Sequence, residues 1–159
     1  MKVYIIGPIG SGKTTLSKKL EKKYNIKSYE LDCIVHDDEN GHVKRKKEEI
    51  EAIFNEIMKQ DSWIIEDVGR NKFNKALEYC DIIYYLKISK RKSYINVIKR
   101  WFKQKIGKEN YTFPPTLSQL YNMIKISRLY FKHEKDKIEK IEKYKYKVKY
   151  LTKRELDLL

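Results

Sequence analysis

The sequence predicts an α/β fold in which a mainly parallel sheet is covered by helices on both faces. Three observations support this prediction. Short apolar runs alternate with longer segments in which apolar residues recur every three to four positions. The apolar runs are almost continuous, as is typical of strands that are buried on both faces. The motif GPIGSGKT, at residues 7–14, directly follows the first apolar run, where a strand is expected to turn into a helix.

This motif predicts a phosphate-binding loop. A strand delivers the chain to a glycine-rich turn whose backbone N–H groups ring a phosphate, and the following helix points the positive end of its dipole at the same anion. Lys13 is expected to reach the β- and γ-phosphates of ATP, and the Thr14 hydroxyl to bind Mg²⁺. A glycine-rich turn without a ligand would not need Lys and Thr after its last glycine. The predicted nucleotide contacts are Gly7, Pro8, Ile9, Gly10, Ser11, Gly12, Lys13, Thr14 and Thr15.

The elements after the loop follow from periodicity. Leu16, Leu20 and Tyr24 recur at helical spacing, whereas the polar stretch 36–47 shows neither the helical period nor the alternation of a strand. Up to residue 60 we expect a helix over about 12–23, a strand over 27–31 that ends at Asp32, a loop or mobile segment over 36–47 and a helix to about residue 59. From there to residue 88 we expect a strand over 62–65 that ends at Glu66 and Asp67, a short helix over 72–78 and a strand over 82–88.

The second half contains one clear interruption. Residues 107–115 hold Gly, Asn and paired prolines, which break the helical pattern and predict a mobile lid over about residues 103–117. Around it we expect a helix over 90–103, a long helix over 116–144, a strand over 146–151 and a terminal helix over 153–158. Because no repeat or linker is visible, we expect one domain over residues 1–159.

The chain is strongly basic, with a formal net charge of +14 from 36 basic and 22 acidic residues. Between residues 82 and 108 there are nine basic residues and no acid. Clustered Lys and Arg attract phosphate backbones, which keeps nucleic acid open as a partner. Only six of the basic residues are Arg, while Lys, Ile, Tyr and Asn abound. This profile resembles the drift of an AT-rich genome, so part of the Lys excess need not carry a function.

Other features argue against a membrane or metal-cluster role. No apolar stretch approaches the roughly 20 residues of a membrane span. The first strand begins by residue 3, which leaves no room for a signal peptide. We therefore expect a cytoplasmic protein, with a monomer favoured. Cys33 and Cys80 each adjoin an expected strand and are interpreted as small apolar fillers. His36, His42 and His133 lack ligand spacing and are expected at the surface.

Acidic residues end two of the expected strands. Because parallel strands end at the same edge of a sheet, Glu66 and Asp67 are placed to organise Mg²⁺ near the phosphate loop, and we favour Glu66 as the metal residue. Asp32 is placed to bind or deprotonate an acceptor hydroxyl. Asp67 and Arg70 are assigned to the acceptor as well, Arg70 as a clamp for an anion. Solvated loop carboxylates and a turn Asp are the alternatives.

The basic segment is expected to carry positive charge above the bound phosphates. Transfer of a γ-phosphoryl group spreads negative charge over its equatorial oxygens, and Arg offers a fixed planar fork to such oxygens. Arg100 and Arg128 are the candidates for this role, beside Lys13. A solvated face is the alternative for each. In the expected lid Tyr111 and Phe113 are placed to stack on a base, whereas the spacing of Trp101 favours the core.

With these motifs in place, the sequence resembles the small P-loop kinases of the adenylate kinase and shikimate kinase type, and most closely the bacterial topology-modulation proteins within that group. The resemblance spans nearly the whole chain. It rests on the phosphate loop, on YELD at residues 29–32, on WIIED at 63–67 and on LTKRELDLL at 151–159. It implies a three-layer α/β/α P-loop NTPase fold, five parallel strands in the order 2-3-1-4-5 and a lid over ATP.

The sequence departs from adenylate kinases at two places. Those enzymes commonly carry two arginines on the helix that enters the lid, where this chain has Asn96 and Arg100. Their acceptor motif DGFPR is only echoed by residues 67–70. A nucleoside monophosphate therefore stays one option for the acceptor. Arg128 lies in a stretch that resembles the post-lid RLxxYH of adenylate kinases, which implies an Arg contact to the transferred phosphate.

Three hypotheses for function follow. The leading one is an ATP- and Mg²⁺-dependent phosphotransferase that acts on an unidentified small acceptor. The second is a nucleic-acid-associated regulatory ATPase, as the resemblance to topology-modulation proteins implies. The third is a nucleotide-binding protein without turnover. Salt separates the first two, because a DNA binder that neutralises several phosphates loses affinity steeply as the salt concentration rises.

Overall fold

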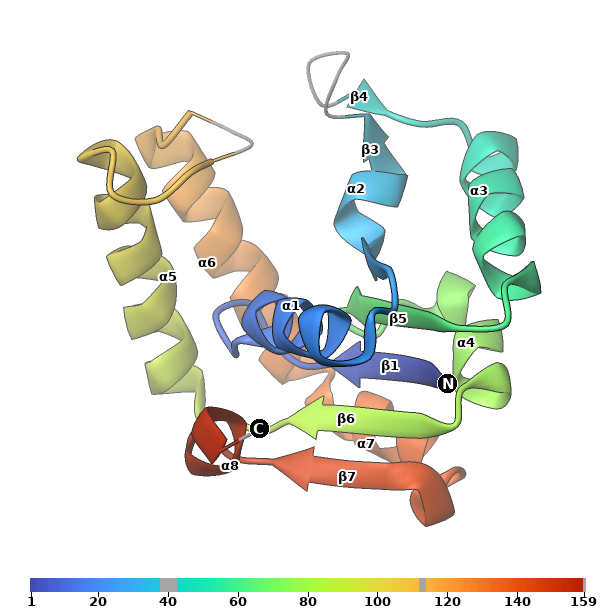
Figure 1. Ribbon diagram of the computed structural model, residues 1–159. Coiled ribbons are helices and arrows are strands. Elements are labelled where there is room, and N and C mark those ends of the chain that lie inside the picture. The colour runs from blue at the N-terminus through green and yellow to red at the C-terminus, as the bar shows by residue number, and fades with distance from the viewer. Residues whose placement is uncertain (38–42, 112–113, 159) are drawn as a thin grey trace.

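A five-stranded parallel sheet forms the centre of the molecule (Figure 1). The computed structural model describes residues 1–37, 43–111 and 114–158. The strand order is β2-β5-β1-β6-β7, which is 2-3-1-4-5 when only these five strands are numbered, so the predicted fold class and order are confirmed. The strands are β1 Lys2–Ile6, β2 Ser28–Glu30, β5 Trp63–Asp67, β6 Ile82–Leu86 and β7 Val148–Leu151.

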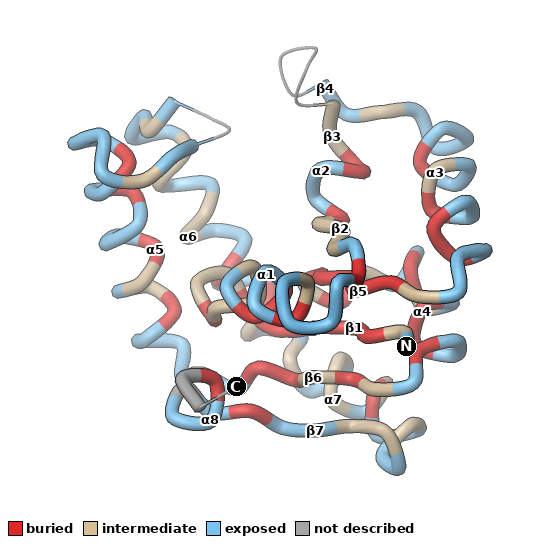
Figure 2. Tube along the Cα trace, viewed as in Figure 1, coloured by how far each residue is buried: buried red, intermediate tan, exposed pale blue. Residues whose placement is uncertain are grey.

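Side chains on the central strands alternate between two cores, as the period of two in a strand requires. Val3 and Ile5 belong to one apolar cluster, and Tyr4 and Ile6 belong to the other. Because both faces are covered, the inner strands β1 and β5 are mostly buried in Figure 2. This double burial explains why the strands read as nearly continuous apolar runs.

Helices cover both faces of the sheet. Figure 1 shows α1 in front of it and α4 and α7 behind it, while α5 packs beside α6 at one end. The helices are α1 Lys13–Tyr24, α2 Leu31–Val35, α3 Lys47–Lys59, α4 Lys75–Tyr79, α5 Lys90–Lys105, α6 Leu117–Lys132, α7 Glu134–Glu142 and α8 Lys153–Leu158, with short 3-10 turns at Asn71–Phe73 and Lys145–Lys147.

The predicted end of the second strand is wrong, and the fourth and fifth strands are shorter than expected, at Ile82–Leu86 and Val148–Leu151. The second strand stops at Glu30, and Leu31–Val35 form α2, because Leu31, Ile34 and Val35 share the helical spacing that buries them in one core. Asp32 therefore lies in the first turn of a helix and not at a strand end. The third strand ends at Asp67, as expected, and its last two residues, Glu66 and Asp67, pair in register with Ile5 and Ile6 of β1.

The expected long helix over 116–144 is also wrong, because α6 ends and α7 begins at His133. Ile141 of α7 belongs to the core that contains Tyr4 and Ile6, and it is fully buried. A short helix expected over 72–78 is a 3-10 turn followed by α4.

In the polar stretch 36–47, a two-stranded antiparallel sheet joins β3 His36–Asp37 to β4 Val43–Lys44, where a loop was expected. His42 lies outside the described residues. Cys80 is buried as expected, but Cys33 is exposed, which corrects its interpretation as a filler. In the part of the chain that the structure describes, no helix is both long and apolar enough to cross a bilayer.

Candidate nucleotide and acceptor site

The phosphate loop has the strand-to-helix setting that its motif predicts, between β1 and α1. Gly12 precedes α1 with a φ of 97°, and Gly10 has a φ of 74°. L side chains rarely adopt this left-handed region, which glycine reaches at little cost. A Cβ at Gly10 would also come within 3.0 Å of the Asn96 Cβ. Helix α5 therefore packs directly against the loop.

Side chains of α5 fix the loop from one side. Ser93 Oγ donates a hydrogen bond to the Ile9 carbonyl at 2.7 Å, and Asn96 Nδ2 donates to the Gly10 carbonyl at 2.8 Å. Ser93 Oγ also lies 2.7 Å from Ser127 Oγ. Because Ser93 has a single hydroxyl proton and gives it to Ile9, Ser127 donates in this pair. The loop is thus connected through α5 to α6, which sequence reasoning did not find.

Lys13 lies among the acidic residues that the sequence singled out. Its Nζ donates to the Pro8 carbonyl at 3.0 Å, so that the side chain reaches back across the loop. Burial lowers the pKa of Lys13, and the charges of Glu66, Asp32 and Asp67 oppose this shift. One ammonium group is therefore coupled to carboxylates from β5 and from α2.

The carboxylate of Glu66 is buried and only partly hydrogen-bonded. It is 4% exposed, and its Oε1 has no hydrogen-bond partner within the described residues. Burial raises the pKa of Glu66 to about 7, against the opposing effects of the Lys13 charge and a hydrogen bond with Thr14. Hard cations prefer oxygen ligands, and an unpartnered carboxylate oxygen beside a threonine hydroxyl provides two of them.

The residues present fit Mg²⁺ held jointly with a nucleotide. The described residues contain no cluster of three His, Cys, Asp or Glu side chains that would form a complete protein site. Mg²⁺ characteristically uses one or two protein ligands together with phosphate oxygens and water. Thr14 and Glu66 match that requirement.

The three predicted acceptor residues lie together. The Asp67 side chain is fully buried, and its Oδ1 accepts from Arg70 Nη1 at 2.5 Å. Its Oδ2 accepts from the Arg70 backbone N–H at 2.5 Å and from the Tyr4 hydroxyl at 3.3 Å. Arg70 Nη2 also donates to Asp32 Oδ1. One guanidinium thus bridges β5 to α2. Tyr4, which the sequence did not single out, adds a hydrogen bond to the buried Asp67 carboxylate.

The two predicted catalytic arginines lie on α5 and α6. Arg100 is half-exposed and pairs with Glu109 through its Nε at 3.3 Å, about one helical turn beyond Asn96. Arg128 is exposed and follows the buried Ser127. Their predicted role at the transferred phosphate stays a prediction.

The aromatic residues near the expected lid separate into two groups. Trp101 is buried, as predicted, and its Nε1 donates to the Thr116 carbonyl at 2.9 Å. Tyr111 is exposed. Phe113 lies outside the described residues.

Comparisons with known proteins find one family match over part of the chain and several kinases of similar fold. A model of the ATPase family associated with various cellular activities (AAA) matches residues 3–68, from β1 to the residue after β5. The chain is similar to a deoxyadenosine kinase from M. mycoides solved with bound dATP, at 12% identity over 99% of this chain and 96% of that one, with a TM-score of 0.52. A gluconokinase from Sinorhizobium meliloti 1021 matches at 11% identity over 95% and 81%, with a TM-score of 0.51.

A shikimate kinase from Acinetobacter baumannii in complex with shikimate matches at 16% identity over 83% of this chain and 78% of that one, with a TM-score of 0.47. A search of curated proteins finds no match. At these identities the likeness to the first two kinases is one of fold, and the chain has the P-loop kinase-like α/β fold.

Proposed function

We propose that this chain is an ATP- and Mg²⁺-dependent phosphotransferase that moves the γ-phosphoryl group of ATP to a hydroxyl group on a small acceptor. The observation that carries the proposal is the convergence of Lys13, Glu66, Asp67 and Asp32 beside the phosphate loop. The kinase-like fold supports it, and so does the dATP bound to one of the similar structures.

The phosphate loop, residues 7–15, binds the ATP phosphates through backbone N–H groups and the Lys13 ammonium. Thr14 and Glu66 hold Mg²⁺, which supplies neutralisation of the charge on the β- and γ-phosphates when it is bound. Ser93 and Asn96 keep the loop carbonyls turned toward α5.

The acceptor lies against Arg70 and Asp32. The acceptor hydroxyl oxygen forms a bond to the γ-phosphorus while the bond from that phosphorus to the β–γ bridging oxygen breaks, and ADP leaves with the bond's electron pair. Asp32 receives the hydroxyl proton. Lys13 stabilises the charge that develops, together with Arg100 and Arg128.

The test is the variant Lys13→Ala. It should lower ATP turnover by about 100-fold or more, the typical cost of losing one aimed electrostatic contact. Lys18→Ala is the matched control, because Lys18 is exposed on the same helix and carries the same charge. Native turnover in a folded Lys13→Ala protein, with an unchanged circular dichroism spectrum, would refute the proposal.

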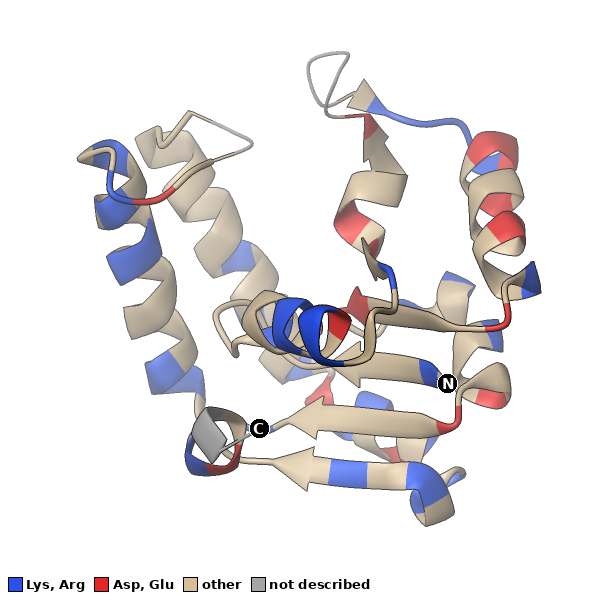
Figure 3. Ribbon diagram, in the orientation of Figure 1, with Lys and Arg blue, Asp and Glu red and all other residues tan. Residues whose placement is uncertain are grey.

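A nucleic-acid-associated ATPase is the second candidate, and one surface favours it. All nine basic residues between residues 82 and 108 are exposed, and Figure 3 shows their charge along α5. Ile95, Ile98 and Phe102 are exposed on the same helix. Fluorescence anisotropy with duplex and single-stranded DNA tests this function. Binding that weakens by orders of magnitude between about 50 and 200 mM salt supports it, and absence of binding at the lower concentration eliminates it.

A further inference from the structure

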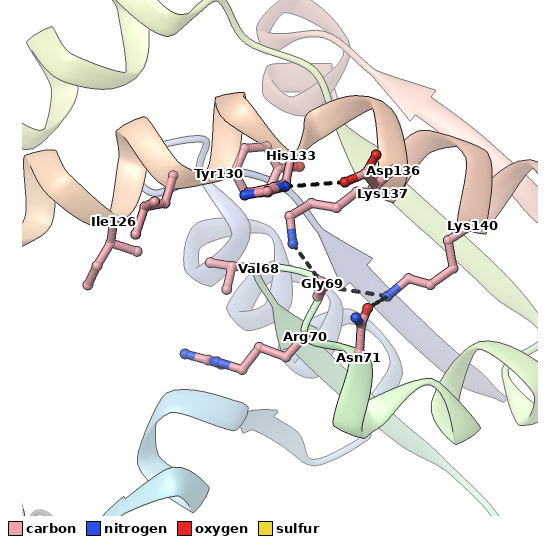
Figure 4. A pocket seen from close by; sticks show the side chains of 11 residues that line it. Val68, Gly69, Arg70, Asn71, Ile126, Tyr130, His133, Asp136, Lys137 and Lys140 are labelled. Atoms are coloured by element: carbon pink, nitrogen blue, oxygen red, sulfur yellow. Dashed lines mark hydrogen bonds and ion pairs between the residues drawn. The ribbon is translucent and has the colours of Figure 1, made fainter.

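A pocket of about 330 Å³ lies between the loop that follows β5 and the helices α6 and α7 (Figure 4). Residues 68–71 form the loop side, and residues between Ile126 and Lys140 form the helix side. Small-molecule sites typically measure about 300–1,000 Å³, so the pocket has room for a small metabolite. None of the roles described above accounts for its helix side.

Two lysines of α7 converge at one end of this pocket. Lys137 Nζ donates to the Gly69 carbonyl at 2.9 Å, and Lys140 Nζ lies 3.4 Å from the same oxygen. Lys140 also donates to Asn71 Oδ1 at 3.3 Å and to Asn74 Oδ1 at 2.8 Å. All of these partners are neutral oxygens. Burial lowers the pKa of both lysines, and the Lys137 charge adds to the shift at Lys140.

The carboxylates near the two lysines are engaged elsewhere. Asp67 acts on both through space, but its oxygens are held by Arg70 and Tyr4. Asp136 lines the pocket and its charge also acts on Lys137 through space, but its side chain is 75% exposed and contacts His133 at 3.2 Å. Within the described residues, no carboxylate forms an ion pair with either ammonium group. An oxyanion there would add the attraction of opposite charges to the hydrogen bonds that both ammonium groups now give to neutral oxygens.

The rest of the pocket suits a carbon skeleton and leads toward the proposed base. Ile126, Leu129 and Tyr130 form an apolar side, and Lys137 Nζ lies 5.2 Å from the centre of the Tyr130 ring. Arg70 lines the pocket as well and points away from Lys140 in Figure 4. Its guanidinium contacts Asp32. The pocket therefore extends from the lysine pair to Arg70, the residue that holds Asp32.

We propose that this pocket binds the acceptor, and that Lys137 and Lys140 hold a carboxylate or phosphate group on it. The substrate class is then a small hydroxy compound with one oxyanion group, whose hydroxyl is directed to Asp32. This inference rests on the proposed phosphotransferase function, which supplies the reaction. When the acceptor binds, its oxyanion replaces the Gly69 carbonyl as the hydrogen-bond acceptor shared by the two ammonium groups.

Nuclear magnetic resonance tests the site with inorganic phosphate as the probe. Phosphate is added to ¹⁵N-labelled protein that already holds saturating Mg·ADP, and the backbone amides of Gly69 and Asn71 are followed. We expect saturable shifts at both amides. Lys137→Met and Lys140→Met should each weaken phosphate binding by about 10-fold or more, the usual effect of losing one charge-assisted hydrogen bond.

Lys135→Met is the control, because Lys135 is exposed on the same helix and the variant loses the same charge. Lys137→Arg keeps the charge and should bind phosphate nearly as the native protein does. If Lys140→Met does not fold, as judged by its spectrum, Lys137→Met decides the question. Native phosphate affinity in Lys137→Met would overturn the proposal, as would shifts confined to Gly10 and Gly12.

Two further readouts separate this inference from the proposed function. The Gly10 and Gly12 amides should shift when Mg·ADP is first added to the free protein. Absence of these shifts would refute nucleotide binding, whereas the phosphate titration at Gly69 would still test the pocket. Turnover is then compared within pairs of acceptors, nucleoside monophosphates against nucleosides and hydroxy acids against their amides. We expect the native protein to prefer the charged member of each pair. Lys137→Met should lose this preference because its KM for the charged acceptor rises. Preference for the neutral member would refute the acceptor class.

Discussion

Replacing Glu66 by Gln removes a carboxylate whose pKa burial raises from 4.5 to about 7. Glutamine has nearly the same shape and does not ionise. The folded protein binds this proton more tightly than the unfolded chain does, so the unfolded state carries fewer protons between these two pH values. Stability of the native protein must therefore fall as the pH rises through that window.

The size of the effect follows from the pKa shift. A shift of about 2.5 units corresponds to about 3 kcal/mol, at 1.36 kcal/mol per unit. The contribution of protonated Glu66 to the free energy of unfolding is present in full below about pH 4.5 and is lost above about pH 7. Because Glu66→Gln has no such group, its free energy of unfolding should rise relative to the native protein by about 3 kcal/mol across the window, most of it between pH 5 and 8.

Urea unfolding at a series of pH values, without nucleotide or metal, measures this difference. Other titrating groups are common to both proteins, so they largely cancel. Glu51→Gln is the control, since Glu51 is exposed on α3 and its removal should change stability by no more than about 0.5 kcal/mol at any pH. A difference between Glu66→Gln and the native protein that stays constant with pH would refute the account of Glu66 as a buried carboxylate.

Three further predictions follow from contacts of the site. Asn96→Ala removes a hydrogen bond to the phosphate loop and should raise the KM for ATP roughly 2- to 10-fold in steady-state kinetics; an unchanged KM argues against this support. Arg70→Met leaves the buried Asp67 carboxylate without its cation and should lower the free energy of unfolding by about 3–5 kcal/mol in urea, whereas a loss below about 1 kcal/mol contradicts the role of this pair. Arg100→Gln breaks only an exposed pair with Glu109, so stability should change by less than about 1 kcal/mol while turnover falls about 100-fold; native turnover would remove Arg100 from the catalytic residues.

Local patterns explain which parts of the fold were predictable. The phosphate loop was found because its function and its turn both depend on residues within one short segment. Helix α3 was found because its buried residues, among them Ile50, Phe54 and Ile57, repeat with a clear helical period. Helix α2 has five residues, which is too short for a period to distinguish it from the end of a strand. The break at His133 has no Gly or Pro to mark it.

The site was predictable as a set of residue types and not as a set of contacts. Asp32, Asp67 and Arg70 could each be singled out near a strand end, but that one guanidinium bridges both carboxylates depends on the packing of α2 against β5. Lys137 and Lys140 lie in a Lys-rich stretch, and nothing in the sequence distinguishes them from the exposed Lys135. Only the fold brings them to Gly69.

The most direct test of the central claim follows the γ-phosphoryl group of labelled ATP. The native protein and Lys13→Ala are incubated with Mg²⁺ and a panel of hydroxy acids, nucleosides and nucleoside monophosphates, and the labelled products are separated. Phosphotransfer predicts label on one of these acceptors with the native protein, and its loss in Lys13→Ala. Label that appears only as inorganic phosphate, or transfer that survives in Lys13→Ala, would contradict the account.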